Sequence, residues 1–167
     1  ENPTPVDSCH FKLNQQNFGY GDSIKSGFDF FRNRPISHVL VLHSDAQTDN
    51  YLLAKSLIES YLRTSSDVVL GSRFSAGSDV AGYNQLRTVG NHFFNILTRL
   101  ASGHSFSDAG TAMILLQKHC LELIDYNSLS SGWKFHPQLN IKIGSLRSLR
   151  IDEVPMKWSD SKVPSSV

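Results

Sequence analysis

Two short apolar runs constrain the fold of this chain more than any other feature of its sequence. They occupy residues 39–42 (Val-Leu-Val-Leu), bounded by His38 and His43, and residues 68–70 (Val-Val-Leu), bounded by Asp67 and Gly71. Runs this short, without polar alternation, are typical of strands that are buried on both faces beneath helices. The sequence therefore predicts an α/β fold whose ligand site lies beyond the carboxyl ends of the strands.

Patterns with helical spacing separate these runs. One helix opens at Gly19 and Gly21 and ends before Pro35, and a second begins near residue 50 with Asp49 or Asn50 as its cap. A long amphipathic helix is predicted over residues 83–101, after a loop at 75–82. The remaining predictions are strands near 11–13, at 111–116 and at 149–157, and helices at 117–124 and 135–143. Alternation of this kind favours a mainly parallel sheet.

Composition narrows the classes of function. The 167 residues fit one domain, residues 1–167, and a formal net charge of +1 with scattered Lys and Arg predicts no nucleic-acid partner. Cys9 and Cys120 are far apart, which predicts thiols in a reducing, cytoplasmic compartment rather than a disulfide scaffold or a zinc site. No apolar run approaches the roughly 18 residues that span a bilayer.

The segment His43-Ser44-Asp45-Ala46-Gln47 follows the first apolar run directly. If the backbone stays extended, His43, Asp45 and Gln47 project together and offer an imidazole, a carboxylate and an amide oxygen. A divalent cation held by few protein ligands completes its shell with substrate phosphates, and an imidazole ligand favours Mn²⁺ over Mg²⁺. The alternative is that Asp45 only caps the following helix.

The same segment resembles the metal-binding D-x-D strand of family 2 glycosyltransferases, and it is most similar to the dolichyl-phosphate mannose synthase-like branch. Further segments resemble that family's motifs in the family's order. They are Asn17-Phe18-Gly19-Tyr20-Gly21, Val68-Val69-Leu70-Gly71-Ser72-Arg73-Phe74, Arg87 with Asn91 and Asn95, Ser107-Asp108-Ala109-Gly110-Thr111-Ala112, and Asp152-Glu153-Val154-Pro155.

This resemblance implies a GT-A fold, a Rossmann-like nucleotide-diphospho-sugar transferase domain. The implied activity is inverting, metal-dependent transfer from a UDP- or GDP-linked sugar to a polyprenyl phosphate or another acceptor. It implies that Asp45 holds Mn²⁺ or Mg²⁺, with His43 and Gln47 as further ligands. Gly21 and Arg73 are expected to contact the donor, and Arg87 an acceptor phosphate. For a hydroxyl acceptor, Asp108 is the candidate base.

Several departures from the family pattern keep other functions open. His43 replaces an aspartate, and arginines of the family are missing at Thr111-Ala112-Met113-Ile114 and at residues 160–166. The family's first nucleotide-binding strand has no counterpart, so we expect a domain incomplete at its N-terminus and membrane-associated through parts absent from this chain. The alternatives are a non-catalytic GT-A-like binding domain and, less favoured, an unrelated phosphate-binding α/β domain. The chain has no G-x-G-x-x-G or P-loop motif.

Overall fold

A computed structural model describes residue 10 and residues 16–159 of the chain. The predicted strand near residues 11–13, Cys9 and the departures at residues 160–166 lie outside this part. The helices are α1 (Tyr20–Arg32), α2 (Asn50–Thr64), α3 (Gln85–Ser102), α4 (Cys120–Leu123), the 3-10 helix η1 (Tyr126–Ser128) and α5 (Phe135–Ser145). The strands are β1 (His38–Val41), β2 (Val68–Ser72), β3 (Asp79–Ala81), β4 (Ile114–Gln117), β5 (Ile151–Pro155) and β6 (Lys157–Ser159).

The main sheet is mixed, and the prediction of a mainly parallel sheet is corrected on this point. Its strand order is β1-β4-β2-β5; β4 is antiparallel to both of its neighbours, and β2 and β5 are parallel. After α3 the chain returns to the end of the sheet at which β2 leaves it, where the Gly71 amide donates to the Met113 carbonyl at 2.9 Å. The next strand can therefore enter the sheet only in the opposite direction. The α/β class itself is confirmed.

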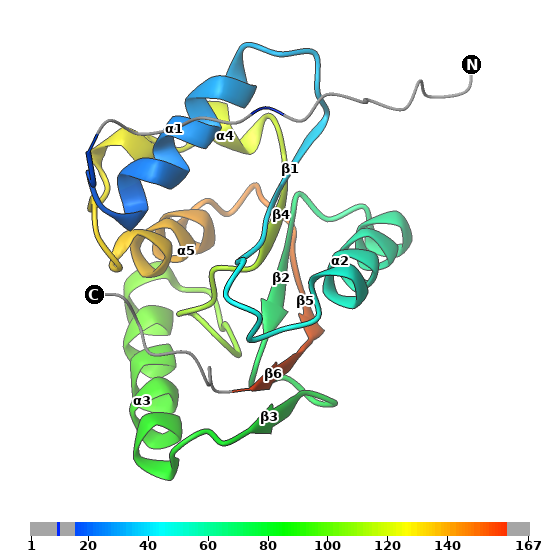
Figure 1. Cartoon of the computed structure of the whole chain (residues 1–167), viewed down its shortest axis with the longest axis vertical. Helices are drawn as coiled ribbons and strands as arrows, with labels where there is room; N and C mark the ends of the chain where they lie inside the picture. Colours follow the sequence, from blue (N-terminus) through cyan, green and yellow to red (C-terminus); the bar gives the residue numbers. More distant parts are fainter. Residues whose placement is uncertain (1–9, 11–15, 160–167) are drawn as a thin grey trace.

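Helices cover both faces of this sheet (Figure 1). Side chains on one face, such as Val68 and Leu70, pack in a core with Phe28 of α1 and Phe135 of α5. On the other face, Val69 packs with Leu53 and other apolar side chains of α2. Successive strand residues thus face opposite cores, which is why residues 39–42 and 68–70 are apolar throughout.

Most predicted elements are present, with changes at their ends. Asp49 caps α2, because its carboxylate accepts from the Leu52 amide at 3.0 Å. The loop at 75–82 contains β3, which pairs in parallel with β6 in a second, two-stranded sheet. The strand predicted over 149–157 is divided at Met156 into β5 and β6, and the helix predicted over 117–124 is reduced to α4. Strands of three residues are too short to produce a periodic pattern.

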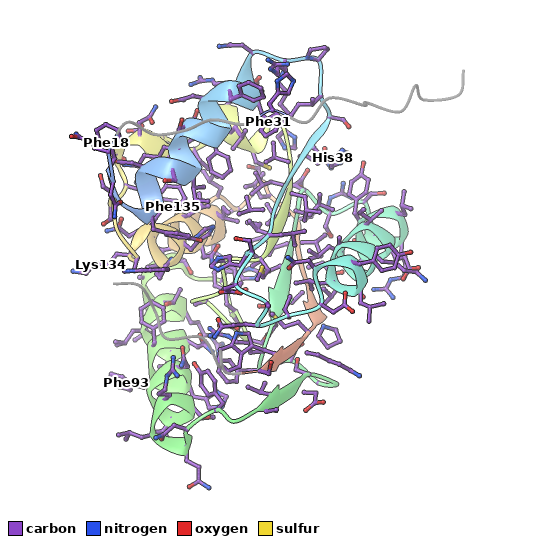
Figure 2. All side chains as sticks on the ribbon, in the orientation of Figure 1. Phe18, Phe31, His38, Phe93, Lys134 and Phe135 are labelled. Carbon is purple, nitrogen blue, oxygen red and sulfur yellow. The ribbon has the colours of Figure 1, made fainter. Side chains whose placement is uncertain are left out.

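Helix α3 turns its polar side toward the protein. Thr98 and Ser102 are buried, and the helix packs against α5. Phe94 is partly buried against the core, but six other large apolar side chains are exposed: Leu86, Val89, Phe93, Ile96, Leu97 and Leu100. Figure 2 shows Phe93 on the side of α3 that faces away from the sheet. An amphipathic helix usually turns its apolar stripe to the core, so this orientation is the reverse of the usual one.

No helix within the described residues combines the length and the apolar character needed to cross a membrane.

Gly21 and Gly27 of α1 are expected to respond oppositely to alanine. A Cβ atom on Gly21 would lie 2.3 Å from the Ser130 carbonyl oxygen, whereas one on Gly27 would meet no atom within 4 Å. Gly21→Ala should therefore lower the free energy of unfolding by about 1–3 kcal/mol. Gly27→Ala should leave it unchanged or raise it by up to about 1 kcal/mol, since alanine is the better helix former. Urea unfolding of the two variants measures this difference, and equal effects would contradict the packing around Gly21.

Candidate functional site

Four loops meet at one edge of the main sheet. Strands β1, β2 and β5 run in the same direction, so the segments that follow them lie at this edge. Because β4 runs the other way, the segment that leads into it lies there too, and Figure 1 shows the loops gathered below the sheet. The edge therefore collects His43 and Asp45 after β1, Arg73 after β2, and Asp108 before β4. This is the position in which α/β sheets bind ligands.

His43 and Asp45 form a close pair. Nδ1 of His43 lies 3.4 Å from Oδ2 of Asp45, and the Asp45 side chain is 40% exposed. The backbone does not stay extended here, because Ala46 adopts a left-handed conformation with φ 58°. Gln47 consequently approaches Asp45 through its backbone, whose amide donates to Oδ1 at 3.2 Å. The structure thus brings two of the three predicted ligands together, and the extended geometry expected for Gln47 is corrected.

Tyr20 joins this pair to a second histidine. Its hydroxyl lies 2.8 Å from Nε2 of His43 and 3.0 Å from Nδ1 of His136 on α5. The Tyr20 ring also stacks on Trp133, with ring centroids 4.8 Å apart and planes inclined by 14°. None of Tyr20, His136 and Trp133 was predicted as a site residue, since these residues share no spacing with Asp45. The signal was Tyr20 within the glycine-rich segment.

One direction of hydrogen bonding accounts for the contacts that join Asp45, His43, Tyr20 and His136. If Nδ1–H of His43 donates to Asp45, then Nε2 of His43 accepts from the Tyr20 hydroxyl, whose oxygen accepts from Nδ1–H of His136. The reverse direction would point a ring-nitrogen lone pair at the carboxylate. Nε2 of His136 is buried without a partner. Together the four groups form a directed chain that ends on Asp45.

Burial controls the ionisation of Tyr20 and His136. It lowers the pKa of His136 to about 3, with a smaller contribution from the charge of His43. Burial, and secondarily the charge of Asp45, raises the pKa of Tyr20 above its usual range. Tyr20 is therefore protonated and His136 neutral at neutral pH. The hydrogen bonds from Tyr20 and His136 therefore hold His43 and Asp45 in place without adding a positive charge beside them.

Arg73 and Asp108 form a buried, bidentate ion pair. Arg73 donates from Nε to Oδ2 at 2.7 Å and from Nη2 to Oδ1 at 2.8 Å, and its backbone amide also donates to Oδ2 at 3.1 Å. Asp108 is 0% exposed. Burial acts to lower the pKa of Arg73, but the hydrogen bonds and charge of Asp108 outweigh it, so the pKa is raised. This carboxylate is committed to Arg73.

An open pocket lies beside this ion pair. Arg73, Tyr83, Arg87, Asn91 and Gly110 contribute to its walls. The Arg87 guanidinium lies 4.9 Å from the centre of the Tyr83 ring, and Nη1 of Arg73 donates to the Tyr83 hydroxyl at 3.4 Å. Asn91 donates to the same hydroxyl at 2.8 Å. Two arginines ordered around one tyrosine provide a setting suited to an anion.

Gly21, which was predicted to contact the donor, is not exposed at this edge of the sheet. It is buried in the first turn of α1, and its amide donates to the Ser131 carbonyl at 2.7 Å. Its role in the structure is the close packing of α1 against the segment before α5.

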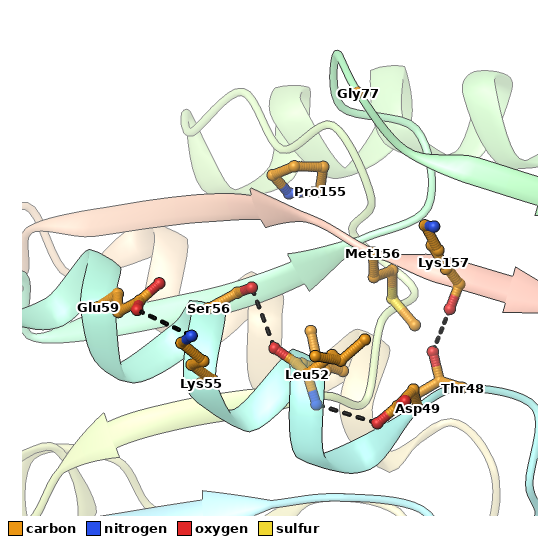
Figure 3. A pocket seen from close by; sticks show the side chains of 11 residues that line it. Thr48, Asp49, Leu52, Lys55, Ser56, Glu59, Gly77, Pro155, Met156 and Lys157 are labelled. Atoms are coloured by element: carbon orange, nitrogen blue, oxygen red, sulfur yellow. Dashed lines mark hydrogen bonds and ion pairs between the residues drawn. The ribbon is translucent and has the colours of Figure 1, made fainter.

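A separate depression lies between α2 and the junction of β5 with β6 (Figure 3). Its polar groups serve the fold: Asp49 caps α2, and Lys55 pairs with Glu59 at 3.8 Å. None of the predicted site residues lines it.

No group of three or more His, Cys, Asp or Glu side chains suited to a metal ion occurs in the part of the chain that the structure describes.

The sequence matches no model of a known protein family.

Proposed function

We propose that this chain is a metal-dependent, inverting glycosyltransferase domain of the GT-A type that uses a UDP- or GDP-linked sugar. The observation that carries the proposal is the His43–Asp45 pair after β1, with ring nitrogen and carboxylate oxygen 3.4 Å apart. It lies at the same sheet edge as the arginine-lined pocket. The segments that contain the pair and the two arginines of the pocket resemble motifs of family 2 glycosyltransferases. The sequence and the arrangement of these residues therefore support the same interpretation.

The His43–Asp45 pair fits a divalent cation. Two ligand atoms about 2.1 Å from one ion, at adjacent positions of its shell, lie about 3 Å apart. The observed 3.4 Å is close to this separation. Asp45 would supply the anionic ligand and Nδ1 of His43 the imidazole lone pair, and the donor's diphosphate would complete the shell, whether the ion is Mn²⁺ or Mg²⁺. With the cation bound, Nε2–H of His43 would donate to the Tyr20 hydroxyl, so the hydrogen bonds would run in the reverse direction to that of the cation-free site. When bound, the cation supplies neutralisation of the charge that develops on the departing diphosphate.

The pocket around Tyr83 suits the phosphate of a polyprenyl phosphate acceptor. Arg87 is exposed at the start of α3, and Arg73 is oriented by Asp108. A phosphate oxygen that attacks the anomeric carbon forms the new bond while the bond to the diphosphate oxygen breaks on the opposite face, which inverts the configuration. Such an acceptor is already an anion and requires no protein base. Arg73 and Arg87 would bind and orient it.

This arrangement gives Asp108 a role different from the predicted one. The carboxylate is fully buried, and both of its oxygens accept from Arg73. In this conformation it does not reach an acceptor hydroxyl, so we propose Asp108 as a positioning residue for Arg73 rather than as a base. A phosphate acceptor is accordingly favoured over a hydroxyl acceptor.

Calorimetric titration of UDP and GDP tests the proposal. In the presence of Mn²⁺, we expect one of the two nucleotides to bind, and we expect EDTA to abolish the binding. Asp45→Asn should weaken metal-dependent binding by at least about tenfold, because it removes the anionic ligand. Unchanged binding by this variant would exclude Asp45 as the metal ligand.

Asp49→Asn is the matched control. It removes a carboxylate four positions away but keeps the cap of α2, since asparagine caps helices as well as aspartate does. Its nucleotide affinity should equal that of the unchanged chain.

The second candidate is a domain that binds a nucleotide sugar without transferring the sugar. If the acceptor is a hydroxyl, the burial of Asp108 favours this second function, because the predicted base is already paired with Arg73. Release or transfer of the sugar from a bound donor separates the two functions.

A further inference from the structure

Trp133 presents an open aromatic face close to the His43–Asp45 pair. Its side chain is 66% exposed, whereas the second tryptophan of the chain, Trp158, is buried in the core. The Trp133 ring stacks on Tyr20, with ring centroids 4.8 Å apart and planes inclined by 14°. Because this stack covers one face of the indole, the exposed area lies on the opposite face and the edges. Only the Tyr20 ring separates the indole from His43, to which the Tyr20 hydroxyl is hydrogen-bonded at 2.8 Å.

The segment that carries Trp133 is fixed by hydrogen bonds to two helices. The Ser131 carbonyl accepts from the Gly21 amide of α1 at 2.7 Å. The Ser130 amide donates to Oε1 of Gln138, on α5, at 2.7 Å. A side chain that is held in place before a ligand arrives loses little conformational freedom when the ligand binds. Trp133 is therefore a preformed surface beside the site.

The start of α5 connects the two parts of the proposed site. His136 contacts the Tyr20 hydroxyl through Nδ1 at 3.0 Å, on the side of the proposed cation. The next residue, Pro137, lines the arginine pocket proposed for the acceptor phosphate. Trp133 precedes these two residues by about one helical turn. A group that lies against Trp133 is thus close to the donor diphosphate on one side and to the acceptor on the other.

We propose that Trp133 binds the hexose ring of the donor, an assignment that rests on the proposed function. In the proposed transfer, the sugar lies between the diphosphate that departs and the phosphate that attacks, because both oxygens approach its anomeric carbon from opposite faces. The nucleobase lies beyond the ribose, away from the acceptor. The C–H groups on one face of a hexose carry a small positive charge and meet the negative face of an aromatic ring.

Covering Tyr20 is the alternative role of Trp133. Tyr20 also has His43 and His136 beside it, with ring centroids 5.6 and 5.5 Å away. A leucine at position 133 would cover the remaining face of Tyr20 with apolar atoms but would present no aromatic face to a ligand. Trp133→Leu therefore separates a contact with the sugar from support of Tyr20.

Calorimetric titration in the presence of Mn²⁺ tests the assignment, with UDP compared with UDP-glucose and GDP compared with GDP-mannose. For the nucleotide that binds, Trp133→Leu should lower the affinity for the sugar-linked form at least about fivefold, because the ring contact is lost. The affinity for the bare nucleoside diphosphate should change less than about twofold. Trp133→Phe keeps an aromatic face and should restore most of the affinity for the sugar-linked form.

Phe93→Leu is the matched control. Phe93 is an exposed aromatic side chain on the outer side of α3, away from the site, and its replacement should change neither affinity. Equal losses for the sugar-linked and the bare nucleotide in Trp133→Leu would assign Trp133 to the support of Tyr20 instead. Such a result, or no loss for either ligand, would overturn the sugar contact and leave the proposed function standing. Absence of metal-dependent nucleotide binding by the unchanged chain would overturn the proposed function and this assignment together.

Acrylamide quenching of tryptophan fluorescence gives a second readout. Trp133 is the exposed indole and Trp158 the buried one, so acrylamide reaches mainly Trp133. With Mg²⁺ in place of Mn²⁺, the sugar-linked nucleotide should reduce this quenching, whereas the bare nucleoside diphosphate should not. Equal protection by the two ligands would show that the sugar does not cover Trp133 and would overturn the assignment.

Discussion

Replacing Asp108 with asparagine is expected to lower the free energy of unfolding by about 3 kcal/mol or more. The substitution keeps the size of the side chain but removes the charge that neutralises Arg73. Arg73 stays largely enclosed, with 17% of its side chain exposed, and loses the bidentate partner of its guanidinium. Removing one member of a buried ion pair is costly because the other charge stays buried and unpaired. Urea unfolding followed by the fluorescence of the buried Trp158 measures the change.

An exposed ion pair supplies the control. Glu59→Gln removes the partner of Lys55 on the surface of α2, where both side chains are more than half exposed, and should change stability by less than about 1 kcal/mol. The double variant Arg73→Gln, Asp108→Asn should lose less than the two single variants added together, since it leaves no unpaired charge. If Asp108→Asn unfolds within about 1 kcal/mol of the unchanged chain, the Arg73–Asp108 pair is not the strong contact that its geometry indicates.

The predictable part of this fold is the part determined by local chemistry. The run at residues 39–42 and the run at 68–70 indicate buried strands by their composition, and Asp49 marks the start of α2 by its capping side chain. These signals require no knowledge of distant residues. The direction of β4 is different, because it depends on where the chain lies after α3, and no local pattern records that.

Periodicity shows that α3 is amphipathic but not which side faces inward. The spacing of Phe93 and Leu100 predicts a helix, and the helix is present. An apolar stripe is usually assigned to the core. Here small polar residues such as Thr98 and Ser102 form the close contact instead, and the stripe faces outward. Composition alone cannot separate a stripe that faces the core from one that faces outward.

The candidate site also has contacts that could be predicted from the sequence and contacts that could not. His43 and Asp45 are neighbours in sequence, so their proximity was predictable. The hydroxyl that links His43 to His136 belongs to Tyr20, which is separated from them by 23 and 116 residues. The partner of Arg73 is likewise 35 residues away. The resemblance to family motifs singled out Arg73 and Asp108 but not Tyr20 or His136 as site residues, and only the fold shows that Asp108 binds Arg73.

Stability is expected to fall as the pH drops below about 6.5, because His136 is buried in its neutral form. Its pKa is lowered from 6.5 to about 3 by burial and by the charge of His43. Above pH 6.5 both the folded and the unfolded chain hold this histidine neutral, so its contribution to stability is fully present. Between pH 6.5 and about 3 only the unfolded chain binds the proton, and stability falls by up to about 1.4 kcal/mol per pH unit. At pH 5 the loss should therefore reach about 2 kcal/mol.

His136→Asn isolates this contribution from the other titrating groups. The asparagine amide can still donate to the Tyr20 hydroxyl from the position of Nδ1, but it binds no proton in the unfolded chain. The variant should lose some stability at every pH, because the side chain is smaller and leaves space in a buried site. The difference in unfolding free energy between the unchanged chain and the variant should then shrink by about 2 kcal/mol from pH 7 to pH 5. A constant difference over this range would mean that His136 is not held neutral, and that the directed chain from His136 through Tyr20 and His43 to Asp45 does not form as described.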